Sequence, residues 1–85
     1  MDWDKLRIFH AVADAGSFTR AGKGLNLSQS AVSRQISTLE ESLQVKLFHR
    51  HARGLKLTEQ GEELFLTASW IVDVLFLAVG DELHS

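Results

Sequence analysis

The stretch from Ser17 to Leu43 limits the possible folds most, because it contains two helix starts separated by a turn. Ser17 and Ser28 each precede residues with helical periodicity, and a serine hydroxyl there can accept a hydrogen bond from an unpaired backbone N–H of the first helical turn. Asn26 lies between the two helical stretches, and asparagine tolerates the left-handed conformation that a tight turn requires. The stretch therefore predicts a helix-turn-helix motif, and the lone apolar residue in its turn, Leu27, is expected to be buried.

The second helix of the motif has one apolar face and one polar face. Its apolar residues recur at the spacing of a buried stripe: Val32, Ile36, Leu39 and Leu43. The remaining faces carry short hydroxyl side chains together with Gln29 and Arg34. Glutamine and arginine can form paired hydrogen bonds with base edges in the major groove of DNA, which is wide enough for one α-helix. Similar faces also occur on helices that contact only water, so this pattern alone leaves DNA recognition and a solvated surface equally open.

Positive and negative charges are distributed unevenly along the 85 residues, although the formal net charge is only −2. Residues 1–58 contain all nine Lys and Arg against five Asp and Glu, a net charge of +4, whereas residues 59–85 contain six acids and no Lys or Arg. Salt screens charges beyond roughly 8 Å at physiological ionic strength, so the acidic part need not cancel the field of the basic part. The basic part is therefore compatible with a nucleic-acid partner.

The composition argues against metal and redox chemistry. The chain has no cysteine, which excludes thiolate ligands and disulfides, and the neighbouring pair His49 and His51 is too small a set of ligands for a metal site. We therefore expect no cofactor, no metal and no enzymatic activity, and we interpret the two histidines as exposed residues that can approach phosphate. The first ten residues include two acids, Asp2 and Asp4, and lack the apolar run of a secretory signal, which favours a cytoplasmic location.

A small hairpin is expected after the motif. Two short β-like runs, residues 47–50 and 55–57, predict a hairpin, or wing, within residues 47–57. Arg50 and Arg53 lie on or beside its tip, where cationic side chains can follow a phosphate backbone or enter a narrow minor groove. A tip that contacts only solvent is the alternative.

Helices are expected at both ends of the chain. Apolar residues at helical spacing predict a first helix from Trp3 to Ala15, and Thr58 can cap a last helix over residues 59–85. The last helix is apolar over more of its circumference than one small domain can cover, so it is expected to pair with a second copy. Its predicted seam consists of Leu64, Ala68, Ile71, Leu75 and Val79. A membrane span is the rival interpretation, but the apolar run is shorter than the ~20 residues that a bilayer requires, and it contains Asp73.

The run SFTRAGKGLNLSQSAVSRQISTLEESLQVKLFHRHARGLKLTEQGE resembles the DNA-binding domain of LysR-type bacterial transcriptional regulators. The resemblance implies a mainly α fold with a winged helix-turn-helix domain over residues 1–58, built from a three-helix core and a small β-hairpin wing. The helix-turn-helix would occupy residues 18–37, and a long linker helix over residues 59–85 would pair antiparallel with that of a partner in a homodimer. The implied function is sequence-specific binding to double-stranded DNA in transcription regulation. The recognition helix would enter the major groove of an interrupted palindrome, and the wing would contact the flanking minor groove or backbone.

Ten side chains are the candidate DNA contacts on these grounds: Thr19, Ser28, Gln29, Ser30, Ser33, Arg34, Ser37, Thr38, Arg50 and Arg53. Two positions depart from the usual family pattern, because Ser30 replaces a proline and Gly22 replaces an alanine. A proline in the first helical turn restricts the unfolded chain, so Ser30 is expected to cost some preorganisation while it adds a hydrogen-bond donor.

The family's effector-binding domain, which has two α/β lobes, is absent from this chain. A small-molecule effector and an oligomer larger than a dimer are therefore expected only in a form that carries such a domain. A protein-binding winged helix is the remaining alternative for the chain itself. The cations Arg34, Arg50 and Arg53 favour DNA, because they fall on the two elements that would straddle one groove and its flank.

Overall fold

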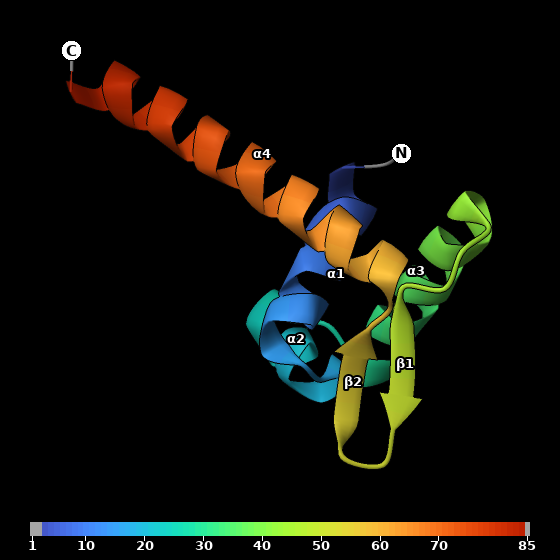
Figure 1. Cartoon of the computed structure of the whole chain (residues 1–85). Helices are drawn as coiled ribbons and strands as arrows, with labels where there is room; N and C mark the ends of the chain where they lie inside the picture. The colour runs from blue at the N-terminus through green and yellow to red at the C-terminus, as the bar shows by residue number, and fades with distance from the viewer. Residues whose placement is uncertain (1–2, 85) are drawn as a thin grey trace.

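A computed structural model describes residues 3–84 of the chain, with side chains described as far as residue 78 except at position 76 (Figure 1). Its elements are, in order, α1 (Trp3–Ala15), α2 (Phe18–Leu25), α3 (Gln29–Leu43), β1 (Phe48–His51), β2 (Gly54–Leu57) and α4 (Glu59–His84). The first three helices form a compact group, the hairpin lies beside it, and α4 projects from the group as a long rod. The predicted mainly α winged helix-turn-helix with a long final helix is confirmed.

Both serine caps of the helix-turn-helix are confirmed. The hydroxyl of Ser17 accepts a hydrogen bond from the backbone N–H of Arg20 at 3.3 Å, and that of Ser28 accepts one from the N–H of Ala31 at 3.1 Å. Asn26 adopts the predicted left-handed conformation, with φ of 59°. The two helices of the motif therefore begin where their local sequence signals place them.

The prediction that Leu27 is buried is wrong, because this residue is 40% exposed. The turn is held to α2 by its backbone instead, since the N–H of Leu27 donates to the carbonyl of Gly22 at 2.8 Å. A Cβ atom on Gly22 would lie only 2.5 Å from the carbonyl oxygen of Leu27, so the missing side chain of this glycine allows the turn to approach α2 closely. The turn therefore packs on Gly22 through its backbone and not through the side chain of Leu27.

The core forms where the first three helices meet the base of the hairpin. Three of the four residues predicted for the buried stripe of α3 are at most 1% exposed: Val32, Ile36 and Leu39. Leu43, at the end of the stripe, is only partly buried. Phe9 of α1 is fully buried and contacts Phe48 of β1, with 5.5 Å between the ring centroids. The hairpin is therefore joined to the helices by aromatic packing at its base.

The wing is an antiparallel hairpin whose strands lie one residue from the predicted positions. His51 pairs with Gly54, so the turn between the strands consists of Ala52 and Arg53. Gly54 has φ of 136°, a conformation that residues with a Cβ atom rarely adopt. This glycine therefore allows β2 to begin after a turn of only two residues. Arg53 is thereby placed at the tip.

The tip of the wing is attached to the turn between α1 and α2. The N–H of Leu55 donates to the carbonyl of Gly16 at 3.3 Å, and Gly16 itself has φ of 70°. A Cβ atom on Gly54 would lie 3.3 Å from the same carbonyl oxygen. The wing is thus held at its tip by backbone contacts and at its base by the core.

Thr58 joins the end of the wing to the start of α4. Its hydroxyl accepts a hydrogen bond from the N–H of Gly61 at 3.0 Å, which confirms the predicted cap, and it donates to the carbonyl of Lys46 at 2.6 Å. Gly61 lies so close to the carbonyl of Leu47 that a Cβ atom there would displace backbone. The first turn of α4 is therefore fixed against residues 46–47, which lead into β1.

The first half of α4 packs against α1, and the second half extends away from it (Figure 1). His10 of α1 hydrogen-bonds the hydroxyl of Ser69 at 3.1 Å, stacks on Phe65 with 4.9 Å between ring centroids, and lies near the buried Ala68. The extension makes the molecule 48 Å long against 25 and 22 Å in the other directions. Within residues 3–84, none of the helices has the length and apolar content needed to span a membrane.

Candidate nucleic-acid interface

The polar face of α3 is exposed near the start of the helix. Gln29, Ser30 and Arg34 are exposed, whereas Ser33 is partly buried. Arg34 follows the fully buried Val32 by two positions, which places it nearly opposite the buried stripe on a helix with 3.6 residues per turn. The arginine and the glutamine are therefore free to reach a ligand outside the domain.

Two of the candidate hydroxyls already form hydrogen bonds within the domain. Ser28 accepts from the N–H of Ala31, so its own hydroxyl hydrogen remains available to a phosphate oxygen. Thr38 donates to the carbonyl of Arg34 at 2.9 Å and therefore retains only acceptor capacity, which suits a base amino group better than a phosphate. Thr19 is exposed on the first turn of α2, beside the Ser17 cap.

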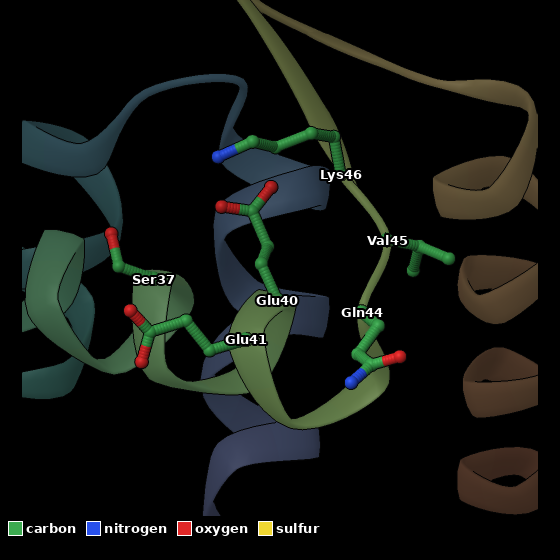
Figure 2. Close-up of a pocket in the computed structure, with 6 residues that line it drawn as sticks. All are labelled: Ser37, Glu40, Glu41, Gln44, Val45 and Lys46. Atoms are coloured by element: carbon green, nitrogen blue, oxygen red, sulfur yellow. The ribbon is translucent and has the colours of Figure 1, made fainter.

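Ser37 lies in a more acidic place than the other candidates. It lines an open hollow of about 410 Å³ at the end of α3, together with Glu40, Glu41, Gln44, Val45 and Lys46 (Figure 2). The carboxylate of Glu40 points toward the side chain of Lys46 in this view, and one of its oxygens accepts a hydrogen bond from the N–H of Leu47 at 2.7 Å. Two carboxylates against one ammonium disfavour a phosphate here, so Ser37 is the weakest of the predicted contacts.

Arg50 and Arg53 have different environments on the wing. The guanidinium carbon of Arg50 lies 5.1 Å from the ring centroid of Phe18 in α2, a cation–π contact that holds this side chain against the helices. Phe18 in turn meets Phe48 edge to face at 6.4 Å. Arg53 is exposed at the tip and lines an open hollow of about 380 Å³ that also includes Gly16 and the turn itself. Arg50 is therefore preorganised, whereas Arg53 projects from the wing.

Two residues with structural roles near the interface were missed by sequence reasoning. Glu40 is 7% exposed, and its carboxylate accepts a hydrogen bond from the N–H of Leu47, which ties α3 to the residue before β1. Gln44 ends α3 in the left-handed conformation with φ of 57°, a position where glycine or asparagine is usual. Neither residue type carries a local signal for these roles.

The predicted dimer seam of α4 is only partly free. Ala68 is 2% exposed within its own subunit, so its assignment to the dimer seam is corrected: α1 already covers this residue. Leu64 and Ile71 are partly buried, Leu75 is 50% exposed, and the side chain of Val79 lies outside the described residues.

A second apolar stripe on α4 is more exposed than the predicted seam. It consists of Leu66, Trp70, Val74 and Leu77, which are 69%, 67%, 42% and 66% exposed. These residues follow one another at steps of four, four and three, so they share one side of the helix. Periodicity alone missed this stripe, because nearly every residue of the segment is apolar and only the packing of α1 shows which side is covered.

Comparison with known proteins identifies the family. Residues 3–62 match the family model described as bacterial regulatory helix-turn-helix protein, lysR family. The chain belongs to the LysR family. This LysR chain is 49% identical over 75 residues to an uncharacterized HTH-type transcriptional regulator of the ibpB-leuC intergenic region of Azotobacter vinelandii, covering 88% of this chain and 52% of that protein. It is 45% identical over 75 residues to the HTH-type transcriptional regulator YofA of Bacillus subtilis (strain 168), covering 88% of this chain and 26% of that protein. The chain therefore spans about half the length of the Azotobacter vinelandii relative and about a quarter of the length of YofA.

Solved structures share the same arrangement. The crystal structure of the BenM DBD/benA site 1 DNA complex has a TM-score of 0.88 at 33% identity, covering 99% of this chain and 94% of that chain. The CbnR DBD–DNA complex has a TM-score of 0.82 at 36% identity, covering 99% of this chain and 95% of that chain. The present LysR chain is therefore a helix-turn-helix domain of the class that binds DNA in transcription regulation, and this is a class of regulators rather than of enzymes.

Proposed function

We propose that this chain recognises double-stranded DNA by inserting α3 into the major groove, while the β1–β2 wing contacts the flanking minor groove or backbone. The exposed Arg34 carries this proposal, because it projects from the recognition helix on the side away from the core. The similarity to the DNA-binding domains of BenM and CbnR, whose structures are DNA complexes, supports DNA as the partner. On this proposal the chain acts in a bacterial transcription regulator in the cytoplasm and has no enzymatic activity of its own.

The candidate side chains divide into base contacts and backbone contacts. Arg34 and Gln29 recognise base edges, since both can form bidentate hydrogen bonds. The hydroxyls of Thr19, Ser28 and Ser30 contact phosphate and fix the register of α3 in the groove. Arg50 meets the sugar-phosphate backbone and Arg53 the minor groove.

Binding of the Arg34→Ala variant to preferred and random duplexes tests the assignment of Arg34. Loss of a bidentate base contact should weaken binding to the preferred site by about 1–3 kcal/mol and flatten the preference at one or two base pairs. Arg7→Ala is a matched control, because Arg7 is 53% exposed on α1 and its guanidinium nitrogen lies 3.9 Å from Asp4. An equal loss on all sequences in Arg34→Ala would instead make Arg34 a phosphate contact.

We further propose that two copies pair through α4 in a two-fold dimer. The exposed stripe Leu66, Trp70, Val74 and Leu77 supports this, because a contiguous apolar patch on a small protein commonly marks a protein interface. A two-fold axis would place the two α3 helices in successive major grooves on one side of the duplex, so operators should be interrupted palindromes. A small-molecule effector, and assembly beyond the dimer, belong to a form with an effector-binding domain.

A further inference from the structure

The wing carries a pair of histidines that the proposed DNA contacts do not use. His49 and His51 are both exposed on β1, and their ring centroids lie 6.2 Å apart. Side chains alternate along a strand, so both imidazoles lie on the face opposite to the buried Phe48 and to Arg50, which rests on α2. The pair therefore occupies the outer face of the wing, where it holds no part of the core together.

Two cations, Lys56 and Arg53, lie near the imidazoles. Lys56 of β2 lies directly across from His49 in the hairpin register, and Gly54 lies across from His51. Arg53 at the tip lines the same open hollow as His51. Neither imidazole forms an ion pair with a carboxylate in the part of the chain that the structure describes. The groups that face the pair are thus positive or neutral, which suits an anionic partner.

We propose that His49 and His51 are protonation-dependent phosphate contacts, so that the wing holds DNA more tightly as the pH falls. The inference rests on the proposed DNA binding. Imidazole is the side chain whose charge ordinarily changes between pH 5 and 8. In the protonated form the pair adds two positive charges to a wing that already carries Arg50, Arg53 and Lys56. A nearby phosphate stabilises the charged form, so DNA binding and proton uptake favour each other.

A bridging metal ion is the competing explanation for a histidine pair, and it predicts the opposite sign. Metal ligation requires neutral imidazole, so protons would compete with the metal and weaken any contact that depends on it at low pH. No group of three or more His, Cys, Asp or Glu that could hold a metal ion occurs among the residues whose side chains the structure describes. The direction of the pH dependence therefore separates the two explanations.

The test measures dissociation constants of the full chain for a random-sequence duplex of about 30 base pairs at pH 5.5 and 8.0, each at several salt concentrations. Every additional phosphate contact steepens the log–log salt slope by about 0.9, which corresponds to several-fold in affinity near 0.1 M salt. The wild type should therefore bind about tenfold or more tightly at pH 5.5, with a steeper salt slope. In His49→Gln/His51→Gln, most of this pH response should disappear. Circular dichroism at both pH values would show that the variant keeps its fold.

A histidine outside the wing supplies the control. His10 is partly buried between α1 and α4, so His10→Gln should retain the pH response of the wild type. Titration calorimetry in two buffers with different ionisation enthalpies should show that the wild type takes up protons on binding and that the double variant takes up fewer. An unchanged pH response in the double variant would overturn the inference. So would wild-type binding that is weaker at pH 5.5 than at pH 8.0 and that loses this pH dependence when EDTA is added. Absence of binding by the wild type at both pH values would overturn the proposed function together with it.

Discussion

The Trp70→Glu substitution gives the most direct test of the proposed dimer. Trp70 is 67% exposed near the middle of the exposed α4 stripe, with Leu66 one helical turn before it and Val74 one turn after it. Because Trp70 lies outside the core of its own subunit, the variant should keep the wild-type helical content and thermal midpoint when measured as a monomer. A carboxylate at this position would lose its water if the dimer formed, so dimerisation should become unfavourable.

The expected magnitude follows from the exposed area. An aromatic side chain buries roughly 150–250 Å², and two thirds of that at about 25 cal/mol per Å² is about 2.5–4 kcal/mol for each Trp70. The two-fold axis makes every loss count twice, although ordering of side chains at the interface reduces the total. We expect the dimer to weaken by at least about 3 kcal/mol, which is more than a hundredfold in the dissociation constant.

Sedimentation at micromolar concentrations measures the oligomeric state, and binding to a full palindrome and to a half-site measures the consequence. Trp70→Glu should be monomeric and should lose far more affinity for the palindrome than for the half-site. Trp3→Glu is the matched control, because Trp3 is 47% exposed on α1 and lies outside the stripe. A Trp70→Glu protein that stays dimeric would move the interface to another surface, and one that unfolds would show that the stripe supports its own subunit.

Two further predictions concern the wing and its connection to α3. If Arg53 enters a narrow A·T-rich minor groove, replacing A·T flanks by G·C should weaken binding of the wild type more than that of Arg53→Ala, and equal losses in a competition assay would disprove this role. Glu40→Ala leaves the buried N–H of Leu47 without its acceptor, so we expect a loss of about 1–3 kcal/mol in the free energy of unfolding, whereas Glu40→Gln, which retains a carbonyl oxygen, should lose less in the same urea titration.

Local signals predicted most of the fold correctly because they act over a few residues. The caps at Ser17 and Ser28 and the left-handed Asn26 each depend on one side chain and its own turn of backbone. The buried stripe of α3 likewise follows from helical spacing alone. The hairpin and the last helix also followed from local patterns, and the resemblance to a family joined them to the helix-turn-helix in one arrangement, which the structure confirms.

Features that depend on packing between distant segments were not predictable in the same way. The side of α4 that faces α1 is decided by contacts such as His10 with Ser69, which are 59 residues apart in sequence. Ala68 therefore looked like a seam residue although α1 covers it. The buried Glu40 was equally hidden, since an acid on a helix is usually exposed and only the nearby N–H of Leu47 explains its burial. The proposed DNA contacts depend on a partner molecule and stay predictions.

Gly22 and Gly24 form a matched pair that separates helix propensity from packing in the helix-turn-helix. Alanine in place of glycine within a helix stabilises by about 0.5–1 kcal/mol when nothing obstructs the methyl group. At Gly24 nothing lies within 4 Å of a Cβ atom, so Gly24→Ala should raise the free energy of unfolding by that amount and the thermal midpoint by a few degrees.

At Gly22 the methyl group would lie 2.5 Å from the carbonyl oxygen of Leu27, and relieving such overlap typically costs about 1–3 kcal/mol. The packing cost should exceed the gain, so Gly22→Ala should lower the thermal midpoint and, by pushing the turn outward, disturb the angle at which α3 meets DNA. Stabilisation by both substitutions would show that the turn shifts freely and that Gly22 does not set the position of α3.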